Sequence, residues 1–140
     1  MGTNKFSEIN TKVRTFNEFR YFEKIKTFNN YNTLFQVREI KFPPYFVSWK
    51  DDSGYSRNVV TYDLPETVTS FHLSRGGINK PELVLVLRGS TPPTFDFGYF
   101  GPNASNCHIY VPDDALETYK ATSPFSSYLN CIYPLSEYEG

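Results

Sequence analysis

Apolar residues recur two positions apart in four short segments, which are Ile40-Lys-Phe42, Tyr62-Asp-Leu64, Leu85-Val-Leu87 and Ile109-Tyr-Val111. Side chains alternate between the two faces of a β-strand, so this pattern predicts four strands that each bury one face. The second apolar residues of successive segments lie 22, 23 and 24 residues apart. A spacing near 23 is typical of repeat proteins, in which short strands stack because none can bury its apolar face alone.

Turn-forming residues separate these segments. Pro43, Pro65 and Pro112 each follow a predicted strand directly, and proline ends a strand because it has no N–H to donate. Turn-rich stretches at 50–54, 74–77 and 100–103 predict the bends between strands. A further alternating segment at 67–73 predicts one more strand inside the second unit.

The N-terminal part has a different pattern. Residues 1–14 are polar and aperiodic and predict an arm. Thr15 and Glu18 then have the spacing of a capping box, and phenylalanines three positions apart follow. We therefore expect a short helix that ends near Ile25 and docks on the strands.

The C-terminal part also predicts helices. Asp113 is placed to N-cap a helix that continues to about Thr122. Ser123 and Pro124 predict the start of a second helix, which ends near Asn130. We expect residues 112–140 to form a two-helix cap that covers the open end of the stacked strands.

Aromatic residues make up 18% of the chain, which favours a β-rich fold with a phenylalanine and tyrosine core. The formal net charge is −1, but the charges are unevenly distributed. Residues 1–50 hold nine Lys and Arg against four Glu, and residues 51–140 hold five against eleven Asp and Glu. This asymmetry indicates head-to-tail contacts between copies, an acidic partner at the N-terminal part, or two solvated surfaces.

Two cysteines, Cys107 and Cys131, are too few for a disulfide framework, and we expect free thiols. No signal-peptide pattern and no apolar stretch of membrane-spanning length is present in the sequence. We therefore expect no membrane insertion.

Several segments resemble the repeats of BspA-type leucine-rich-repeat proteins, and the C-terminal run is similar to the segment with which such proteins end. The matching residues are 17–22, 24–28, 64–71, 109–120 and 133–138. Proteins of this family occur on the surfaces of gut and oral bacteria, and comparable segments appear in structural proteins of phages. The resemblance implies a binding or structural function. Residues 29–60 depart from the family consensus, and the small number of repeats and the missing export signal shift the expectation towards a phage particle.

These observations predict one α+β domain at residues 15–140. Its expected architecture is a short leucine-rich-repeat-like β-solenoid of four or five strands, with the N-terminal helix and the two-helix cap. We expect a non-enzymatic module that acts through protein contacts as a capsid- or tail-associated virion component, made in the host cytoplasm. Its partners would be copies of itself or other virion proteins. The alternative is a fragment of a bacterial cell-surface adhesin that binds host protein or glycan.

The sequence offers little for catalysis. Cys107 and His108 are adjacent, but neighbouring side chains of a strand point to opposite faces, so they should not form a thiol–imidazole pair. The histidines and cysteines lack the short ligand pairs of zinc sites, and a single Arg75-Gly-Gly is weak as a nucleic-acid motif. We expect no catalytic residue, metal, cofactor or nucleic-acid partner.

Aromatic residues supply the candidate binding site. Tyr45, Phe46, Trp49 and Tyr55 gather around a Pro-Pro pair and an Asp-Asp-Ser-Gly turn. Exposed aromatics on loops serve protein and sugar recognition, although the same residues could pack in the core. A second cluster lies between Phe95 and Phe100.

Overall fold

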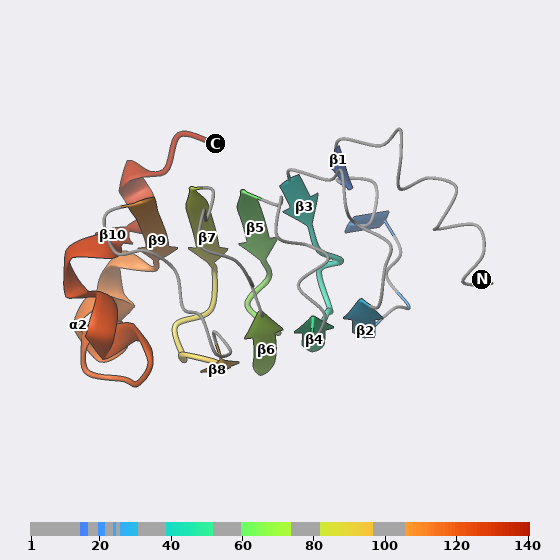
Figure 1. Cartoon of the computed structure of the whole chain (residues 1–140), viewed down its shortest axis with the longest axis horizontal. Coiled ribbons are helices and arrows are strands. Elements are labelled where there is room, and N and C mark those ends of the chain that lie inside the picture. The colour runs from blue at the N-terminus through green and yellow to red at the C-terminus, as the bar shows by residue number, and fades with distance from the viewer. Residues whose placement is uncertain are drawn as a thin grey trace.

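The computed structural model describes residues 15–16, 20–21, 24, 26–30, 39–51, 60–73, 82–96 and 106–140. Within these ranges the chain alternates between two parallel β-sheets and ends in a helical segment (Figure 1). The six-stranded sheet contains, in spatial order, β1 (Thr15–Phe16), β3 (Glu39–Lys41), β5 (Thr61–Leu64), β7 (Leu83–Leu87), β9 (Cys107–Val111) and β10 (Ile132–Pro134). The four-stranded sheet contains β2 (Thr27–Asn30), β4 (Ser48–Asp51), β6 (Ser70–Leu73) and β8 (Thr94–Asp96).

The four segments predicted from the alternating pattern are neighbours in the six-stranded sheet. Ile40 pairs with Tyr62, Tyr62 with Leu85, and Leu85 with Ile109, all in parallel orientation. The spacing near 23 residues therefore equals one step along the sheet. The register also carries over to Ile132 in β10, which pairs with Ile109.

The predicted fold class, a leucine-rich-repeat-like solenoid of four or five strands with an N-terminal helix and a two-helix cap, is wrong. The described residues form ten strands in two parallel sheets, with a single α-helix, α2 (Leu116–Lys120), of five residues. Successive repeats of about 23 residues also contribute one strand each to the four-stranded sheet. In β6 and β8 a buried aromatic side chain lies between two more exposed polar residues. Phe71 is buried between Ser70 and His72, and Phe95 between Thr94 and Asp96.

The predicted N-terminal helix is absent from the described residues of its range. Thr15 and Phe16 pair with Glu39 and Ile40 as β1, and Arg20 and Tyr21 lie in a 3₁₀ turn. A helix of about ten residues is marginal by itself, whereas an adjacent strand offers backbone partners at once. The predicted arm at 1–14 lies outside the described residues.

The predicted two-helix cap is replaced by short turns around α2. The 3₁₀ segments are Asp113–Ala115, Phe125–Cys131 and Leu135–Glu137. Asp113 makes no N-cap; its carboxylate instead accepts a hydrogen bond of 3.0 Å from the Ser136 backbone N–H. The hydrogen bonds from Ser136 lower the pKa of Asp113. Residues 112–140, here called the C-terminal segment, are thus fixed by long-range contacts more than by helix capping.

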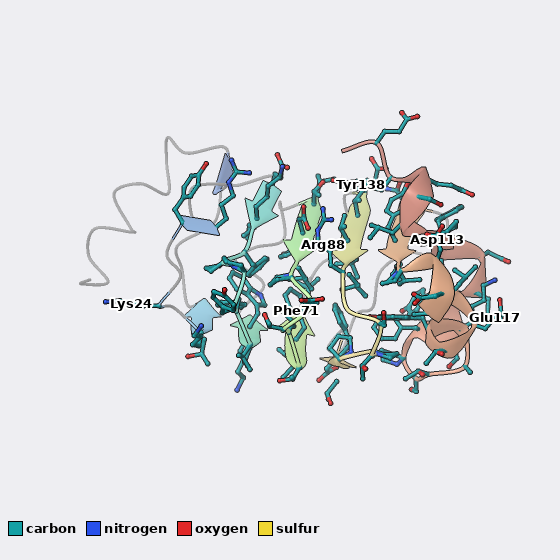
Figure 2. All side chains as sticks on the ribbon, turned by 180° about the vertical axis from the view of Figure 1, so that it is seen from behind. Lys24, Phe71, Arg88, Asp113, Glu117 and Tyr138 are labelled. Atoms are coloured by element: carbon teal, nitrogen blue, oxygen red, sulfur yellow. The ribbon has the colours of Figure 1, made fainter. Side chains whose placement is uncertain are left out.

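Aromatic rings from both sheets fill the core. Trp49, Phe71 and Phe95 occupy one register position of the four-stranded sheet, and their rings stack with centroid distances of 6.1 and 4.9 Å. Tyr62 of the facing sheet meets Phe71 edge-on at 5.6 Å. Phe125 continues the row into the C-terminal segment, 5.5 Å from Phe95. Figure 2 shows Phe71 between the two sheets.

The prolines after the strands form the corners between sheets. Phe46 N–H donates to the Pro43 carbonyl, and Val68 N–H donates to the Pro65 carbonyl, so both corners are four-residue turns. Thr67 joins the corners, because its hydroxyl donates to the Phe46 carbonyl at 2.7 Å. The corners therefore stack like the strands.

Candidate functional site

Two of the four residues of the predicted aromatic site lie in the core. Phe46 is 0% exposed and Trp49 is 1% exposed, so neither can contact a partner. Tyr45 is 55% exposed, and the Lys26 ammonium lies 4.5 Å from its ring centroid. Tyr55 lies outside the described residues. Of the second cluster, Phe95 is buried and residues 97–100 are not described.

The six-stranded sheet presents a polar and charged outer face. Its outward positions alternate with the buried ones and place Lys41 beside Asp63, and Val84 beside His108. Val86 shares this face yet is fully buried. Figure 1 shows the chain end turning back from β10 towards β7, and Tyr138 near that end packs on Tyr110, the register partner of Val86.

The larger hollow on this face, here called the basic hollow, has a volume of about 460 Å³. It lies where β3, β5 and β7 end and the proline corners begin. Parallel strands end at the same sheet edge, so residues far apart in sequence converge there. The lining residues are Arg20, Tyr21, Lys41, Phe42, Pro44, Asp63, Pro65 and Arg88.

Arg88 and Asp63 form an ion pair with two hydrogen bonds in the basic hollow. Arg88 Nε donates to Asp63 Oδ1 at 2.7 Å, and a terminal nitrogen donates to Oδ2 at 3.1 Å. These hydrogen bonds raise the pKa of Arg88, which stays charged. The Asp63 side chain is 12% exposed, so the pair is shielded enough to hold its geometry.

A second hollow of about 320 Å³, here called the acidic hollow, lies further along the same face. Its charged residues are Glu82, Glu137 and Glu139, together with His108. His108 Nδ1 lies 3.4 Å from Glu82 Oε1, which is ion-pair distance without hydrogen-bond alignment. The remaining lining residues are Thr61, Val84, Tyr110, Tyr138 and Gly140.

Tyr138 lines the acidic hollow and also interacts electrostatically with Asp63 and Arg88 of the basic hollow. Its ring packs 5.0 Å from that of Tyr110, and desolvation raises the pKa of its hydroxyl, with Asp63 adding to the effect. Figure 2 shows Tyr138 and Arg88 on the same side of the molecule. The outer face therefore carries opposite charge on either side of one tyrosine.

The outer face of the four-stranded sheet carries a histidine–carboxylate pair. His72 Nδ1 and Asp96 Oδ2 are 2.9 Å apart across β6 and β8. The arrangement resembles a base with its orienting acid, but neither residue lines the basic or the acidic hollow. The pair is therefore best understood as a cross-strand contact.

The expected separation of Cys107 from His108 is confirmed. Cys107 is buried in the core, whereas the ring of His108 stacks on Tyr133 with a centroid distance of 5.6 Å. Cys131 is also buried and lies in hydrogen-bond contact with Cys107, and both are free thiols. Burial raises the pKa of Cys131, which disfavours a reactive thiolate.

No three His, Cys, Asp or Glu side chains of the described ranges lie together in a way that could hold a metal ion. No helix in the part of the chain that the structure describes is long and apolar enough to cross a membrane.

The two ends of the molecule carry opposite charge. Figure 2 shows Lys24 at one end and Asp113 and Glu117 at the other. Among the described residues, positions 20–50 hold five Lys and Arg against one Glu, while positions 106–140 hold five Asp and Glu against one Lys. The charge asymmetry of the sequence therefore becomes a separation along the long axis.

Sequence reasoning missed both hollows. The residues of each hollow come from four separate segments, and no local motif links them. The repeat spacing could have indicated part of the basic hollow, because aligning the strands by that spacing places Lys41 next to Asp63.

Comparison of the chain with protein-family models, with curated proteins and with solved structures found no match.

Proposed function

We propose that the chain is a non-enzymatic structural and recognition module that acts through protein contacts, and that copies associate end to end as a component of a phage particle. The observation that carries this proposal is the separation of charge along the molecule (Figure 2). A basic end and an acidic end on one rigid stack favour head-to-tail contact between copies. The phage setting rests on the resemblance to BspA-type segments, which also occur in phage structural proteins.

The residues at the ends are suited to such contact. Lys24 and Lys26 are exposed at the basic end, and Asp114 and Glu117 are exposed on the C-terminal segment. Glu117 accepts only a 3.3 Å bond from Lys120, three residues away. Exposed charges of this kind attract a partner weakly and over a distance of about 10 Å at moderate salt, so association should depend on salt concentration.

Sedimentation velocity at 20 and 500 mM NaCl tests the proposal. We expect dimers and larger species at low salt and monomers at high salt. Lys24→Gln/Lys26→Gln removes charge at one end, and Asp114→Asn/Glu117→Gln removes charge at the other. Each variant alone should be monomeric, and an equimolar mixture should form dimers, since each keeps one intact end.

Glu66→Gln is the matched control, because Glu66 is exposed in a corner between the two ends. It should associate like the parent chain. A parent chain that is monomeric at 20 mM NaCl, or a mixture that stays monomeric, would contradict the proposal.

The alternative is a bacterial cell-surface adhesin fragment that binds host protein or glycan. The observation in its favour is the exposure of Tyr21 and Tyr45, at 69% and 55%. Exposed tyrosines offer flat apolar surface with a polar tip, which sugars and proteins both use. Glycan-array binding that Tyr45→Ala abolishes, in a chain that does not self-associate, would favour this alternative.

A further inference from the structure

The basic hollow has a surplus of positive charge. Three cations, Arg20, Lys41 and Arg88, line it together with one carboxylate, that of Asp63. Because Arg88 binds Asp63 through two hydrogen bonds, these two charges cancel each other. Arg20 and Lys41 therefore set the net charge of the hollow.

Glu39, which lies outside the hollow, does not neutralise Lys41. Glu39 Oε1 lies 3.9 Å from Lys41 Nζ, and both side chains are about one third exposed, at 32% and 29%. An ion pair at that distance and exposure contributes little. Lys41 thus remains able to bind an incoming anion.

Arg20 is held at the rim by its neighbour. Its terminal nitrogen donates to the Tyr21 hydroxyl at 2.9 Å, and its guanidinium carbon lies 4.9 Å from the Tyr21 ring centroid. A guanidinium has five N–H donors, of which this bond uses one. The exposed Tyr21 ring and the corner prolines add apolar surface beside the cations.

We propose that the basic hollow binds an extended acidic peptide segment through its carboxylates. Lys41 and Arg88 follow strands two places apart in the sheet, which is about 10 Å. In a segment with the extended polyproline II conformation, two acidic residues three positions apart lie on the same face and are separated by about 9 Å. One carboxylate of a Glu-x-x-Glu segment can therefore pair with Lys41, and the other can accept from N–H donors of Arg88 beyond the two that bind Asp63, with the intervening residues against Tyr21. This site is independent of the end-to-end contact.

Isothermal titration calorimetry at 20 mM NaCl tests the proposal with the acetylated, amidated peptide Glu-Ala-Ala-Glu. Its counterpart Gln-Ala-Ala-Gln has the same shape without charge. We expect the acidic peptide to bind at least fivefold tighter than its counterpart. Lys41→Gln and Arg20→Gln should each weaken the acidic peptide by about threefold to tenfold. Lys50→Gln, an exposed lysine on the other sheet, is the matched control and should leave binding unchanged.

Each outcome decides the proposal. Equal binding of the two peptides, no binding, or binding insensitive to both Lys41→Gln and Arg20→Gln would overturn it. Tighter binding of tetragalacturonate than of the acidic peptide would overturn the peptide assignment in favour of an acidic carbohydrate. Circular dichroism identifies any variant that fails to fold. If one of Lys41→Gln and Arg20→Gln does not fold, peptide binding by the other variant decides the outcome. Peptide binding by the monomeric Asp114→Asn/Glu117→Gln variant separates this site from end-to-end association.

Discussion

Tyr119 links the C-terminal segment to the sheets through one buried hydrogen bond. Its side chain is 0% exposed, and its hydroxyl donates to the Gly89 carbonyl at 2.7 Å. Tyr119→Phe would leave that carbonyl without this donor, so we expect the free energy of unfolding to fall by about 1 to 2 kcal/mol. Urea unfolding followed by circular dichroism measures the change. Tyr133→Phe removes a longer bond of 3.3 Å nearer the surface and should change stability by less than about 0.5 kcal/mol.

Tyr119 also predicts how stability depends on alkaline pH. Burial raises the pKa of its hydroxyl above the ordinary value near 10, so the folded chain keeps a proton that the unfolded chain loses. The contribution of the protonated Tyr119 hydroxyl to the free energy of unfolding is therefore fully present below pH 10 and is lost as the pH rises above 10. Between pH 10 and 11.5 the free energy of unfolding should fall about 1 kcal/mol per pH unit more steeply in the parent chain than in Tyr119→Phe. Parallel pH profiles in urea titrations would contradict this assignment.

The buried thiols should be chemically silent in the folded chain. Cys107 and Cys131 are 3% and 0% exposed, and burial raises the pKa of Cys131. A thiol reacts as its thiolate, so Ellman's reagent at pH 8 should modify neither residue until guanidinium unfolds the chain. The absorbance change gives the number of reactive thiols. Rapid reaction of two thiols without denaturant would show that the C-terminal segment opens readily.

At the scale of elements, the stacked aromatics of the four-stranded sheet hold the two sheets together. Phe71 is 1% exposed and contacts Trp49 and Phe95 along its sheet and Tyr62 across the core. Phe71→Ala should lower the free energy of unfolding by about 3 to 5 kcal/mol through lost burial and a cavity. Ser70→Ala, on the exposed side of the same strand, should change it by less than about 0.5 kcal/mol. If both variants lowered the free energy of unfolding by similar amounts, the loss would come from changes to the strand and not from removal of the Phe71 ring.

The elements also show what the sequence could reveal. Strands with two or more alternating apolar residues, such as Tyr62–Leu64, were predictable because period two is a direct signature of one buried face. Strands with a single buried aromatic, such as β8 around Phe95, give a weaker pattern and were missed. The helix expected from Thr15 failed because pairing with β3 satisfies the same backbone groups.

For the candidate site, sequence reasoning failed in a specific way. Trp49 and Tyr45 are four residues apart, yet one is buried and the other is exposed, because Trp49 points inward from β4 and Tyr45 lies in a corner. Amino-acid composition alone cannot distinguish a buried aromatic residue from an exposed one. Predicting that the charged residues of the basic hollow lie together would have required the register of β3, β5 and β7. The repeat spacing gives that register only after the strands have been aligned.

At the scale of the whole molecule, strand order predicts a gradient of local stability. β7 and β9 have paired neighbours on both sides, and Leu85, Val86 and Ile109 in them are 0% exposed. Backbone amides there should exchange with deuterium more slowly than those of β1 or β10, the edge strands of the same sheet. Hydrogen exchange followed by mass spectrometry measures the gradient. Uniform protection across all described strands would instead indicate one cooperative unfolding unit.

The parallel register has one more consequence, for how the chain could change its length. Each strand pairs with a strand one unit earlier and one unit later, and equivalent residues such as Ile40, Tyr62 and Leu85 occupy the same place in every unit. Duplicating one unit of about 23 residues in the gene would therefore add one strand to each sheet and move the two charged ends apart by about 4.8 Å. The distance between the two charged ends is therefore set by the number of copies of one segment.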